Sequence, residues 1–362
     1  MTTPARIPVT SRHGTYEVLV GAGVAEGLAE RLDGLPLPAR RVVVSQARIW
    51  RLHGRLLAPL LARRTPILLP DGERHKTLAT VSRIHDALIR LAADRATTVV
   101  AFGGGLVGDI AGFAAATYLR GVPVVQVPTT LLAQVDAAIG GKVGVNHAQG
   151  KNLIGAFHAP ALVVADPLLL ATLPRREFRS GLYEVVKYGV IASRDLFDRV
   201  ADGLPAIFAR EPAALQPLVV ESCRIKADVV GRDELEQGPR RVLNLGHTVG
   251  HALEAITRYR RYLHGEAVAL GLLVAAELAV TRGVMGSPDR SRLARLVMQM
   301  GPLPPLADLS AAATLDAIHL DKKMAAGRLH MVLPLGLGSV AIVSDVTDRE
   351  LTRAMRAAGM QK

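Results

Sequence analysis

The chain has 362 residues, 49% of them hydrophobic and 21% charged, a composition typical of a globular protein with a large buried core. This length predicts two domains, and no apolar run reaches the roughly 20 residues that a membrane span requires. The formal net charge of +12 comes from scattered basic residues, mostly arginine, so it favours small anionic substrates over nucleic acid.

Cysteine usage and the first residues bear on where the protein works. Cys223 is the single cysteine, which excludes an internal disulfide and mildly favours a cytosolic protein. The opening sequence MTTPARIPVTSRHG contains no apolar signal segment. We therefore expect a cytoplasmic protein that does not associate with membranes.

Short apolar runs alternate with helical segments over the first half of the chain. They predict strands at 15–20, 41–44, 66–69, 97–102, 122–127 and 161–165. From about Phe178 the pattern predicts helices at 179–192, 195–203, 212–233, 246–257, 265–283 and 290–300, then a hairpin at 328–333 and 338–343 and a last helix from about Thr347. The sequence thus predicts an α/β domain at 1–175 with a parallel Rossmann-like sheet, and a mainly α-helical domain at 176–362.

A glycine-rich turn follows the fourth predicted strand and opens a helix. Gly103, Gly105 and Gly108 fit the G-x-G-x-x-G pattern, in which backbone amides can approach a diphosphate. Lys142 and Lys151 follow in the same stretch, and such cations suit a phosphorylated or carboxylated ligand. In an ordinary Rossmann domain the glycine motif belongs to the first strand, so a dinucleotide would be held here in a non-standard way.

A second turn, DGERHK, ends the predicted strand 66–69. Open α/β sheets place ligand contacts at the carboxyl ends of their strands, so Glu73 and Lys76 are candidates for ribose and phosphate contacts. A pair of this kind standing alone is more often a solvated helix start.

Three histidines gather in the second half. His247 and His251 stand one helical turn apart in LNLGHTVGHALE, and His264 follows in YLHGEAVALG. Two histidines at i, i+4 with a carboxylate are typical of zinc sites, although this is not the H-E-x-x-H pattern of metalloproteases. Spacing favours His247 and His251 as ligands, and one or two of the histidines could instead be ordinary helix-surface residues. The candidates for a third ligand are Glu184, Glu254 and Glu266.

Long motifs give the chain a family resemblance over nearly its whole length. They are DGERHKTL, FGGGLVGDIAGFAAATYLRG, VPTTLLAQVDAAIGGKVGVNHAQGKNLIGAFH, GLYEVVKYG, LNLGHTVGHALE and LHGEAVALGL. In these stretches the chain resembles the 3-dehydroquinate synthases, within the wider group of sugar-phosphate cyclases. The resemblance implies an N-terminal NAD-binding domain and a C-terminal metal-binding domain, with the active site between them.

The resemblance also implies a set of site residues. It makes Glu184, His247 and His264 the ligands of one divalent metal, zinc or cobalt, and it turns His251 toward the substrate. The residues implied for NAD are Asp71, Glu73, Lys76, Gly104, Gly105, Asp109, Thr129, Thr130, Lys142, Lys151 and Thr172. The residues implied for substrate and catalysis are Arg120, Asp136, Lys142, Asn152, Lys187, Lys226, Arg240, Asn244, His251 and the Lys322–Lys323 pair.

The implied reaction closes DAHP, a seven-carbon sugar acid phosphate, into 3-dehydroquinate with loss of phosphate. Hydride leaves C5, phosphate is eliminated, hydride returns, and an intramolecular aldol step forms the ring, so there is no net redox change. Arg120 matches an arginine that reaches the neighbouring subunit's phosphate site, which implies a homodimer. On a helix continuing from Pro239, Arg240 would share a face with His247.

Departures from the family pattern leave alternatives open. Ser45–Gln46 stands where the family commonly has Asp or Asn near the adenosine, and Val143, Tyr183 and Pro239 replace frequent Thr, Ala and Leu. An amino-dehydroquinate synthase, or another sugar-phosphate cyclase of secondary metabolism, is thus an alternative. A metal-dependent polyol dehydrogenase is a second, and a nucleic-acid binder is the remote third.

Overall fold

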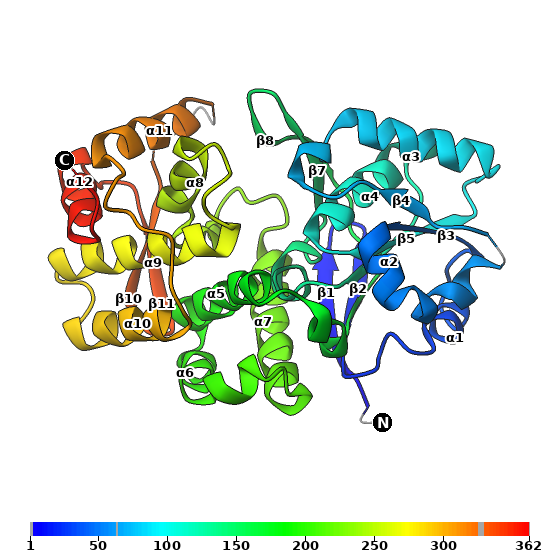
Figure 1. Ribbon diagram of the computed structural model, residues 1–362, viewed down its shortest axis with the longest axis horizontal. Helices are drawn as coiled ribbons and strands as arrows, with labels where there is room; N and C mark the ends of the chain where they lie inside the picture. Colours follow the sequence, from blue (N-terminus) through cyan, green and yellow to red (C-terminus); the bar gives the residue numbers. More distant parts are fainter. Residues whose placement is uncertain (1–2, 63, 325–328, 362) are drawn as a thin grey trace. The chain divides into compact units, whose positions relative to one another are not determined.

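The computed structural model describes residues 3–62, 64–324 and 329–361, with side chains for all of these except 321–324. The chain forms two compact units (Figure 1). The first comprises Met1–Pro174 and Arg210–Leu235, and the second comprises Arg175–Ala209 and Glu236–Lys362. The single boundary expected after residue 175 therefore misplaces one helix. That helix, α7 (Pro212–Arg232), belongs to the first unit because it packs on the first two strands.

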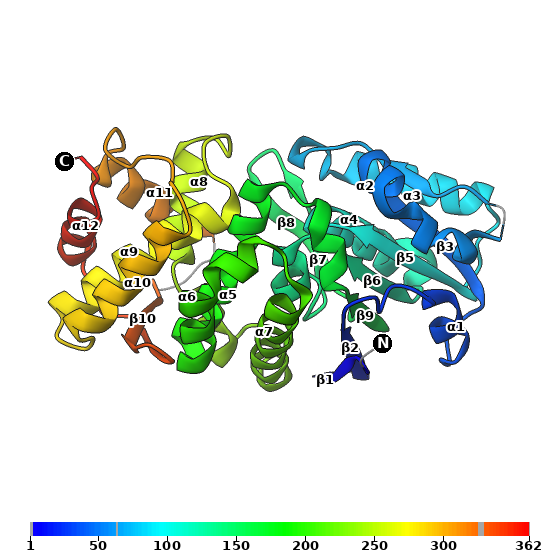
Figure 2. The same cartoon turned by 60° about the horizontal axis from the view of Figure 1, so that its bottom comes forward.

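A seven-stranded sheet runs through the first unit in the order β1-β2-β9-β6-β5-β3-β4 (Figure 2). β1 and β2 pair antiparallel, and all other neighbours pair in parallel, as the Rossmann-like prediction requires. The strands are β1 (Ala5–Ser11), β2 (Gly14–Val20), β3 (Arg40–Gln46), β4 (Ile67–Leu69), β5 (Thr97–Gly103), β6 (Val124–Pro128) and β9 (Leu162–Ala165). A separate antiparallel hairpin consists of β7 (Lys142–His147) and β8 (Gly150–Phe157).

Helices cover the sheet on both faces. The α-helices of this unit besides α7 are α1 (Leu28–Asp33), α2 (Ala47–His53), α3 (Leu78–Arg90) and α4 (Gly105–Thr117). Its short turns are η1 (Gly54–Leu56), η2 (Ala58–Leu61), η3 (Glu73–His75), η4 (Tyr118–Arg120), η5 (Ala133–Ala137) and η6 (Pro167–Thr172). α3 begins at the N-cap Thr77, whose side chain accepts a hydrogen bond from Thr80 N.

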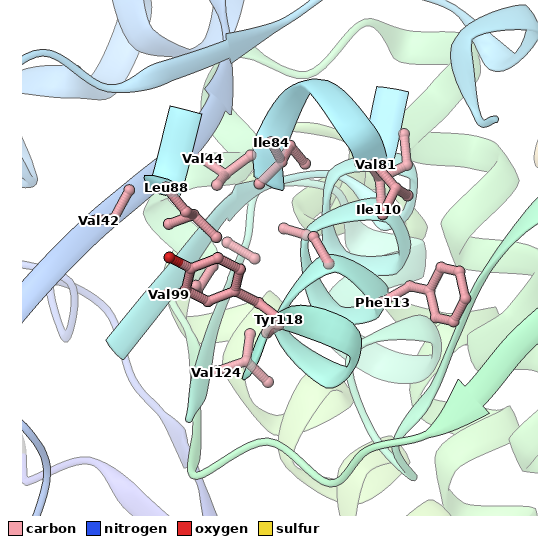
Figure 3. Close-up of a cluster of buried hydrophobic side chains, with 14 of the residues drawn as sticks. Val42, Val44, Val81, Ile84, Leu88, Val99, Ile110, Phe113, Tyr118 and Val124 are labelled. Carbon is pink, nitrogen blue, oxygen red and sulfur yellow. The ribbon is translucent and has the colours of Figure 1, made fainter. Parts of the chain in front are cut away.

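The core under α3 and α4 is shown in Figure 3. α3 contributes Val81, Ile84 and Leu88, whose spacing at i, i+3 and i+7 places them on one helix face toward the sheet. Every residue of β5 is buried, as expected of a central parallel strand covered on both faces. Tyr118 lies in this core as well, and its hydroxyl donates to the carbonyl oxygen of Ala93 at 2.7 Å.

The second unit is mainly helical, as predicted. Its elements are α5 (Arg175–Ala192), α6 (Arg194–Phe208), η7 (Pro239–Asn244), α8 (His247–Ile256), α9 (His264–Thr281), α10 (Ser287–Gln299), α11 (Ala311–Met324), β10 (Met331–Gly336), β11 (Ser339–Val343) and α12 (Asp348–Ala357). α9 is the central helix and packs against α5, α8, α10 and α12 (Figure 1). Among the described residues, α9 alone has the length and apolar composition of a membrane span. However, 72% of that stretch is buried inside the protein, as in a core helix.

Several elements differ from the sequence prediction. β1 and the β7–β8 hairpin were not predicted. α5 begins at Arg175, four residues before the predicted helix start at residue 179. α11 continues to Met324, so the backbone of Lys322 and Lys323 is helical, whereas their side chains lie outside the described residues.

Candidate active site

The glycine-rich turn joins β5 to α4. Gly104 is the N-cap of α4, and no side chain caps this helix in the described part of the chain. A Cβ atom on Gly104 would lie 2.9 Å from Cγ2 of Thr130, so a larger residue would collide with the loop after β6. Thr129 N also donates to the carbonyl oxygen of Gly103 at 2.9 Å, which ties the two loops together. An uncapped helix start beside a tight glycine turn can bind an anion such as a diphosphate.

This turn stands where the strand order reverses. β3 and β4 extend the sheet one way, β5, β6 and β9 extend it the other way, and β3 and β5 are neighbours. Open α/β sheets bind ligands outside the carboxyl ends of the strands at such a point. The glycine motif is therefore in an ordinary ligand position, although it does not follow the first strand.

Ser45 and Gln46 end β3 at the same reversal point. The hydroxyl of Ser45 is fully buried and donates to the carbonyl oxygen of Phe102 at 2.7 Å. Ser45 therefore ties β3 to β5, and it is not available for a contact with a nucleotide. Gln46 is partly exposed at the start of α2.

A hydrogen-bond network joins residues that were assigned to two different ligands. Lys76 Nζ lies 2.5 Å from Asp109 Oδ2 and 2.5 Å from Asn152 Oδ1. Asn146 continues the network, since its side-chain amide donates to Glu73 at 2.8 Å and its amide oxygen accepts from Asn152 N at 2.9 Å. Burial raises the pKa of Asp109, and the nearby Lys76 cation opposes that rise. One buried lysine thus connects the implied NAD residues to an implied substrate residue.

The other residues predicted in the first unit lie on several different elements. Asp136 is on the π-helical turn η5 and forms an ion pair with the buried Lys226 of α7, whose ammonium also donates to the Asp136 carbonyl oxygen at 2.6 Å. Thr172 ends η6, with its hydroxyl 2.7 Å from His53 Nε2. The exposed or partly exposed remainder are Asp71 after β4, Arg120 in η4, Lys142 in β7 and Lys151 in β8.

In the second unit, Glu184, His247 and His264 converge on one point. Candidate ligand atoms of the three residues all lie within 4.8 Å of one another. Oε1 of Glu184 is 3.8 Å from His247 Nε2 and 3.6 Å from His264 Nε2. The Glu184 side chain is fully buried, and its Oε1 has no hydrogen-bond partner among the described residues. Lys187 Nζ lies 2.5 Å from Oε2, on the same helix face at i, i+3.

Glycines allow the helices that carry these ligands to approach closely. A Cβ atom on Gly265 would overlap the carbonyl oxygen of Ser180, one turn before Glu184 on α5. A Cβ atom on Gly271 would likewise overlap the carbonyl oxygen of Gly246, the residue before His247. Gly246 itself has φ +79°, a conformation that favours glycine. The three ligand-bearing helices can meet only because these positions carry no side chain.

The Nδ1 atoms of His247 and His264 face different hydrogen-bond acceptors. Nδ1 of His247 lies 3.1 Å from the Leu245 carbonyl oxygen, and Nδ1 of His264 lies 3.3 Å from Glu254 Oε2. Burial, with nearby Lys187 and the other histidines, holds the pKa of His247 well below its usual value. Burial also pushes the pKa of His264 down, but the hydrogen bond and charge of Glu254 raise it overall. Each Nδ1 thus faces an acceptor, and each Nε2 faces Glu184.

This arrangement fits a divalent cation. Lys187 pairs with Oε2 of Glu184, which leaves Oε1 facing Nε2 of His247 and Nε2 of His264. Imidazole nitrogens held by an acceptor on their far side are typical metal ligands. The set of two nitrogens and one carboxylate leaves a position for substrate, as in catalytic zinc sites.

The ligand choice suggested by spacing alone does not match this centre. His251 is exposed, and its ring centroid is 5.3 Å from that of His247. It belongs to a second possible group with Glu254 and His264 instead. Glu266 is occupied elsewhere, since Arg176 donates to both of its oxygens at 2.8 and 2.7 Å. Burial would raise the pKa of Glu266, but these and other hydrogen bonds lower it.

Arg240 and Asn244 lie in η7, before the centre. The chain does not run as one helix from Pro239 to His247, because η7 ends at Asn244 and α8 begins at His247, after Gly246 in its left-handed conformation. Arg240 is nonetheless only 2% exposed, so it is not a surface arginine. The Asn244 side chain donates to Glu236 Oε1 at 2.8 Å.

The fold and the two sites define a class of protein, in which a dinucleotide-type sheet accompanies a two-histidine, one-carboxylate centre. A solved 2-epi-5-epi-valiolone synthase from Streptomyces hygroscopicus, with NAD+ and Zn2+ bound, superposes with a TM-score of 0.87 at 30% identity, covering 96% of this chain and 98% of that one. A 2-deoxy-scyllo-inosose synthase with carbaglucose-6-phosphate, NAD+ and Co2+ superposes with a TM-score of 0.84 at 28% identity, covering 98% of this chain and 99% of that one.

Sequence comparison gives the family. The model of the 3-dehydroquinate synthase N-terminal family matches residues 66–180, and that of the C-terminal family matches residues 181–324. A 3-dehydroquinate synthase from Pelotomaculum thermopropionicum is 47% identical over 348 residues, covering 95% of this chain and 94% of the relative. The chain belongs to the 3-dehydroquinate synthase family.

Proposed function

We propose that this chain converts DAHP into 3-dehydroquinate and phosphate, as a lyase of the shikimate pathway that leads to aromatic amino acids. The observation that carries the proposal is the convergence of Glu184, His247 and His264 in a chain of this family. Its identity to the curated 3-dehydroquinate synthase, 47%, exceeds the 30% and 28% to the valiolone and inosose synthases. Hydride is removed and returned within one cycle, so the reaction has no net redox change.

We assign one divalent ion, zinc or cobalt, to Glu184, His247 and His264. A set of nitrogen and oxygen ligands suits either metal. The ion would supply a Lewis acid that polarises a substrate oxygen. Lys187, buried beside Glu184, would hold an anionic substrate group close to this point, and His251 would face the substrate from the exposed side of α8.

We assign NAD to the glycine turn and the surrounding loops of the first unit. The dinucleotide would supply a hydride acceptor that is restored in each cycle. Gly104 and Gly105 would leave the amides of α4 open to its diphosphate, and Lys76 with Asp109 would orient the neighbouring ribose and phosphate groups. The remaining assigned residues are Asp71, Glu73, Thr129, Thr130, Lys142, Lys151 and Thr172.

The remaining predicted residues would hold the substrate's anionic groups. The planar guanidinium of Arg240 can bind a carboxylate with two parallel hydrogen bonds. DAHP carries such a carboxylate, whereas sedoheptulose phosphate and glucose phosphate do not. The other substrate residues are Asp136, Lys142, Asn152, Lys226, Asn244 and Lys322.

We further propose that the enzyme works as a cytoplasmic homodimer. Arg120 supports the dimer, because the matching arginine of the family serves the neighbouring subunit's phosphate site. The side chain is exposed and its backbone has φ +69°, a strained conformation for arginine that is more common at functional positions.

The test is phosphate release from DAHP, measured with and without NAD and with and without a metal chelator, while absorbance at the NADH band is followed. We expect release to need both NAD and metal, and no NADH to accumulate. Stoichiometric growth of NADH would contradict the proposal and favour a polyol dehydrogenase. Faster turnover of a substrate without the carboxylate, or of an amino analogue of DAHP, would favour another cyclase.

A further inference from the structure

The environment of His264 contains a carboxylate that the function proposed above does not use. Glu254 Oε2 lies 3.3 Å from His264 Nδ1, and the opposite ring nitrogen, Nε2, lies 3.6 Å from Glu184 Oε1. The imidazole of His264 therefore lies between two carboxylates. Glu254 is only 4% exposed, and a buried acid is retained at such a position only with compensating contacts.

We propose that Glu254 is a positioning residue for the metal centre, an inference that rests on the proposed function. By accepting a hydrogen bond from Nδ1–H of His264, it holds the tautomer in which Nε2 has no proton and faces Glu184. A carboxylate in this role also makes the imidazole a stronger ligand. Glu254 thereby raises the affinity of the protein for its divalent ion without contacting the ion.

The position of Glu254 in the sequence supports this role. It follows His247 by seven residues on α8, and seven residues are close to two helical turns, so both side chains lie on the face that meets α9. His264 is the first residue of α9. One helix thus supplies a ligand directly and orients a second ligand on its neighbour.

The two histidines differ in what accepts their Nδ1 proton. The acceptor for His247 is the backbone carbonyl of Leu245, which no substitution at that position can remove. The acceptor for His264 is a side chain, so its effect can be measured by mutation. The orientation of His264 is therefore the adjustable part of the centre.

A competing arrangement uses the same glutamate as a metal ligand, because His251, Glu254 and His264 also lie close enough to hold an ion. In that arrangement Glu254 and His251 would bind the ion directly. The arrangement with Glu184 is favoured because the buried Glu184 turns Oε1 toward Nε2 of both His247 and His264. Nδ1 of His264 already faces Glu254 at hydrogen-bond distance.

The experiment measures the Kd for zinc and for cobalt by chelator competition on the full chain. We expect Glu254→Ala to bind either metal about 10- to 100-fold more weakly than the wild type, the usual effect of removing such a partner. Glu254→Gln should lose less, because its amide oxygen still accepts from Nδ1–H. Glu277→Gln is the matched control, since Glu277 lies on α9, 13 residues after His264, and pairs with Arg290 at 2.7 Å. Its Kd should stay within twofold of the wild type.

Two further variants distinguish an error in the proposed metal centre from an error in the positioning role of Glu254. Glu184→Ala should abolish tight binding, and wild-type affinity in this variant would overturn the proposed metal centre itself. His251→Ala should leave the affinity unchanged, and the visible spectrum of the saturated cobalt form should be the same in Glu254→Ala as in the wild type. A Kd within twofold of the wild type in Glu254→Ala would overturn the positioning role. A changed cobalt spectrum would also overturn it, by making Glu254 a ligand. If Glu254→Ala does not fold, Glu254→Met, which also removes the acceptor, takes its place in both measurements.

Discussion

The closeness of α5 and α9 makes Gly265→Ala a direct test of how the metal centre is assembled. The added Cβ atom would overlap the backbone carbonyl of Ser180, which cannot rotate away. Alanine improves helix propensity by up to about 1 kcal/mol, whereas overpacking against a rigid neighbour costs about 1–3 kcal/mol. Because the overlap is severe and involves backbone, we expect a net loss of about 1–2 kcal/mol of unfolding free energy. For a protein of this size that lowers Tm by about 1–3 °C.

The same substitution should weaken the centre as well as the fold. His264 adjoins Gly265, and Ser180 lies one turn before Glu184, so separating the helices moves His264 from Glu184. A displacement of about 1 Å can lower kcat about 100-fold.

The assay combines thermal unfolding, zinc titration and kcat, with Gly231→Ala as control. Gly231 is also helical, but its added Cβ atom would meet only Thr10, at an ordinary 3.7 Å. The control should keep wild-type zinc affinity and kcat and lose no stability. A Gly265→Ala protein with wild-type Tm and zinc affinity would show that the close helix approach does not hold the ligands together.

Three further substitutions or treatments test other parts of the reasoning. Arg240→Lys should lower kcat/KM for DAHP at least tenfold, about 1.4 kcal/mol, with metal content unchanged; near-wild-type turnover would exclude a two-point grip on the carboxylate. Lys76→Met should raise the Kd for NAD at least tenfold, because it leaves Asp109 and Asn152 without their shared cation. An unchanged Kd in a calorimetric titration would contradict this role of Lys76. Burial raises the pKa of Cys223 to about 12, so its thiol should resist a thiol reagent at pH 8 until the protein is unfolded. The unfolded thiol ionises near pH 8.5, so this group's contribution to stability is complete below that pH and is lost as the pH rises toward 12.

Hydrophobic periodicity predicted most of the fold because buried strands and core helices leave a strong pattern. It missed β1, whose buried Ile7 and Val9 alternate correctly but flank Pro8, a residue confined to edge strands. The sequence prediction also missed the β7–β8 hairpin, a segment rich in glycine. A Cβ atom on Gly144 would lie 2.6 Å from the carbonyl oxygen of Ile154, so these glycines serve close strand pairing.

The metal centre shows where sequence spacing stops being informative. The i, i+4 pattern correctly placed His247 and His251 near each other, but it could not tell which of them faces Glu184. That depends on where α8 begins and on how α9 crosses α5, which are tertiary features. The role of Arg176 in holding Glu266 depends in the same way on two helices that are far apart in sequence.

Glycine permits a different kind of close approach in each of the two units. At Gly104 the missing side chain lets the loop after β6 come close to a helix start that a diphosphate can occupy. At Gly246, Gly265 and Gly271 it lets helices approach until a carboxylate and two imidazoles meet. At Gly246, Gly265 and Gly271 the atom that an added Cβ would meet first is a backbone oxygen, whereas at Gly104 it is the methyl group of Thr130. A pattern of glycines beside His, Glu and Lys therefore indicates positions where backbone segments approach closely. The His, Glu and Lys side chains next to these glycines are then held near one another.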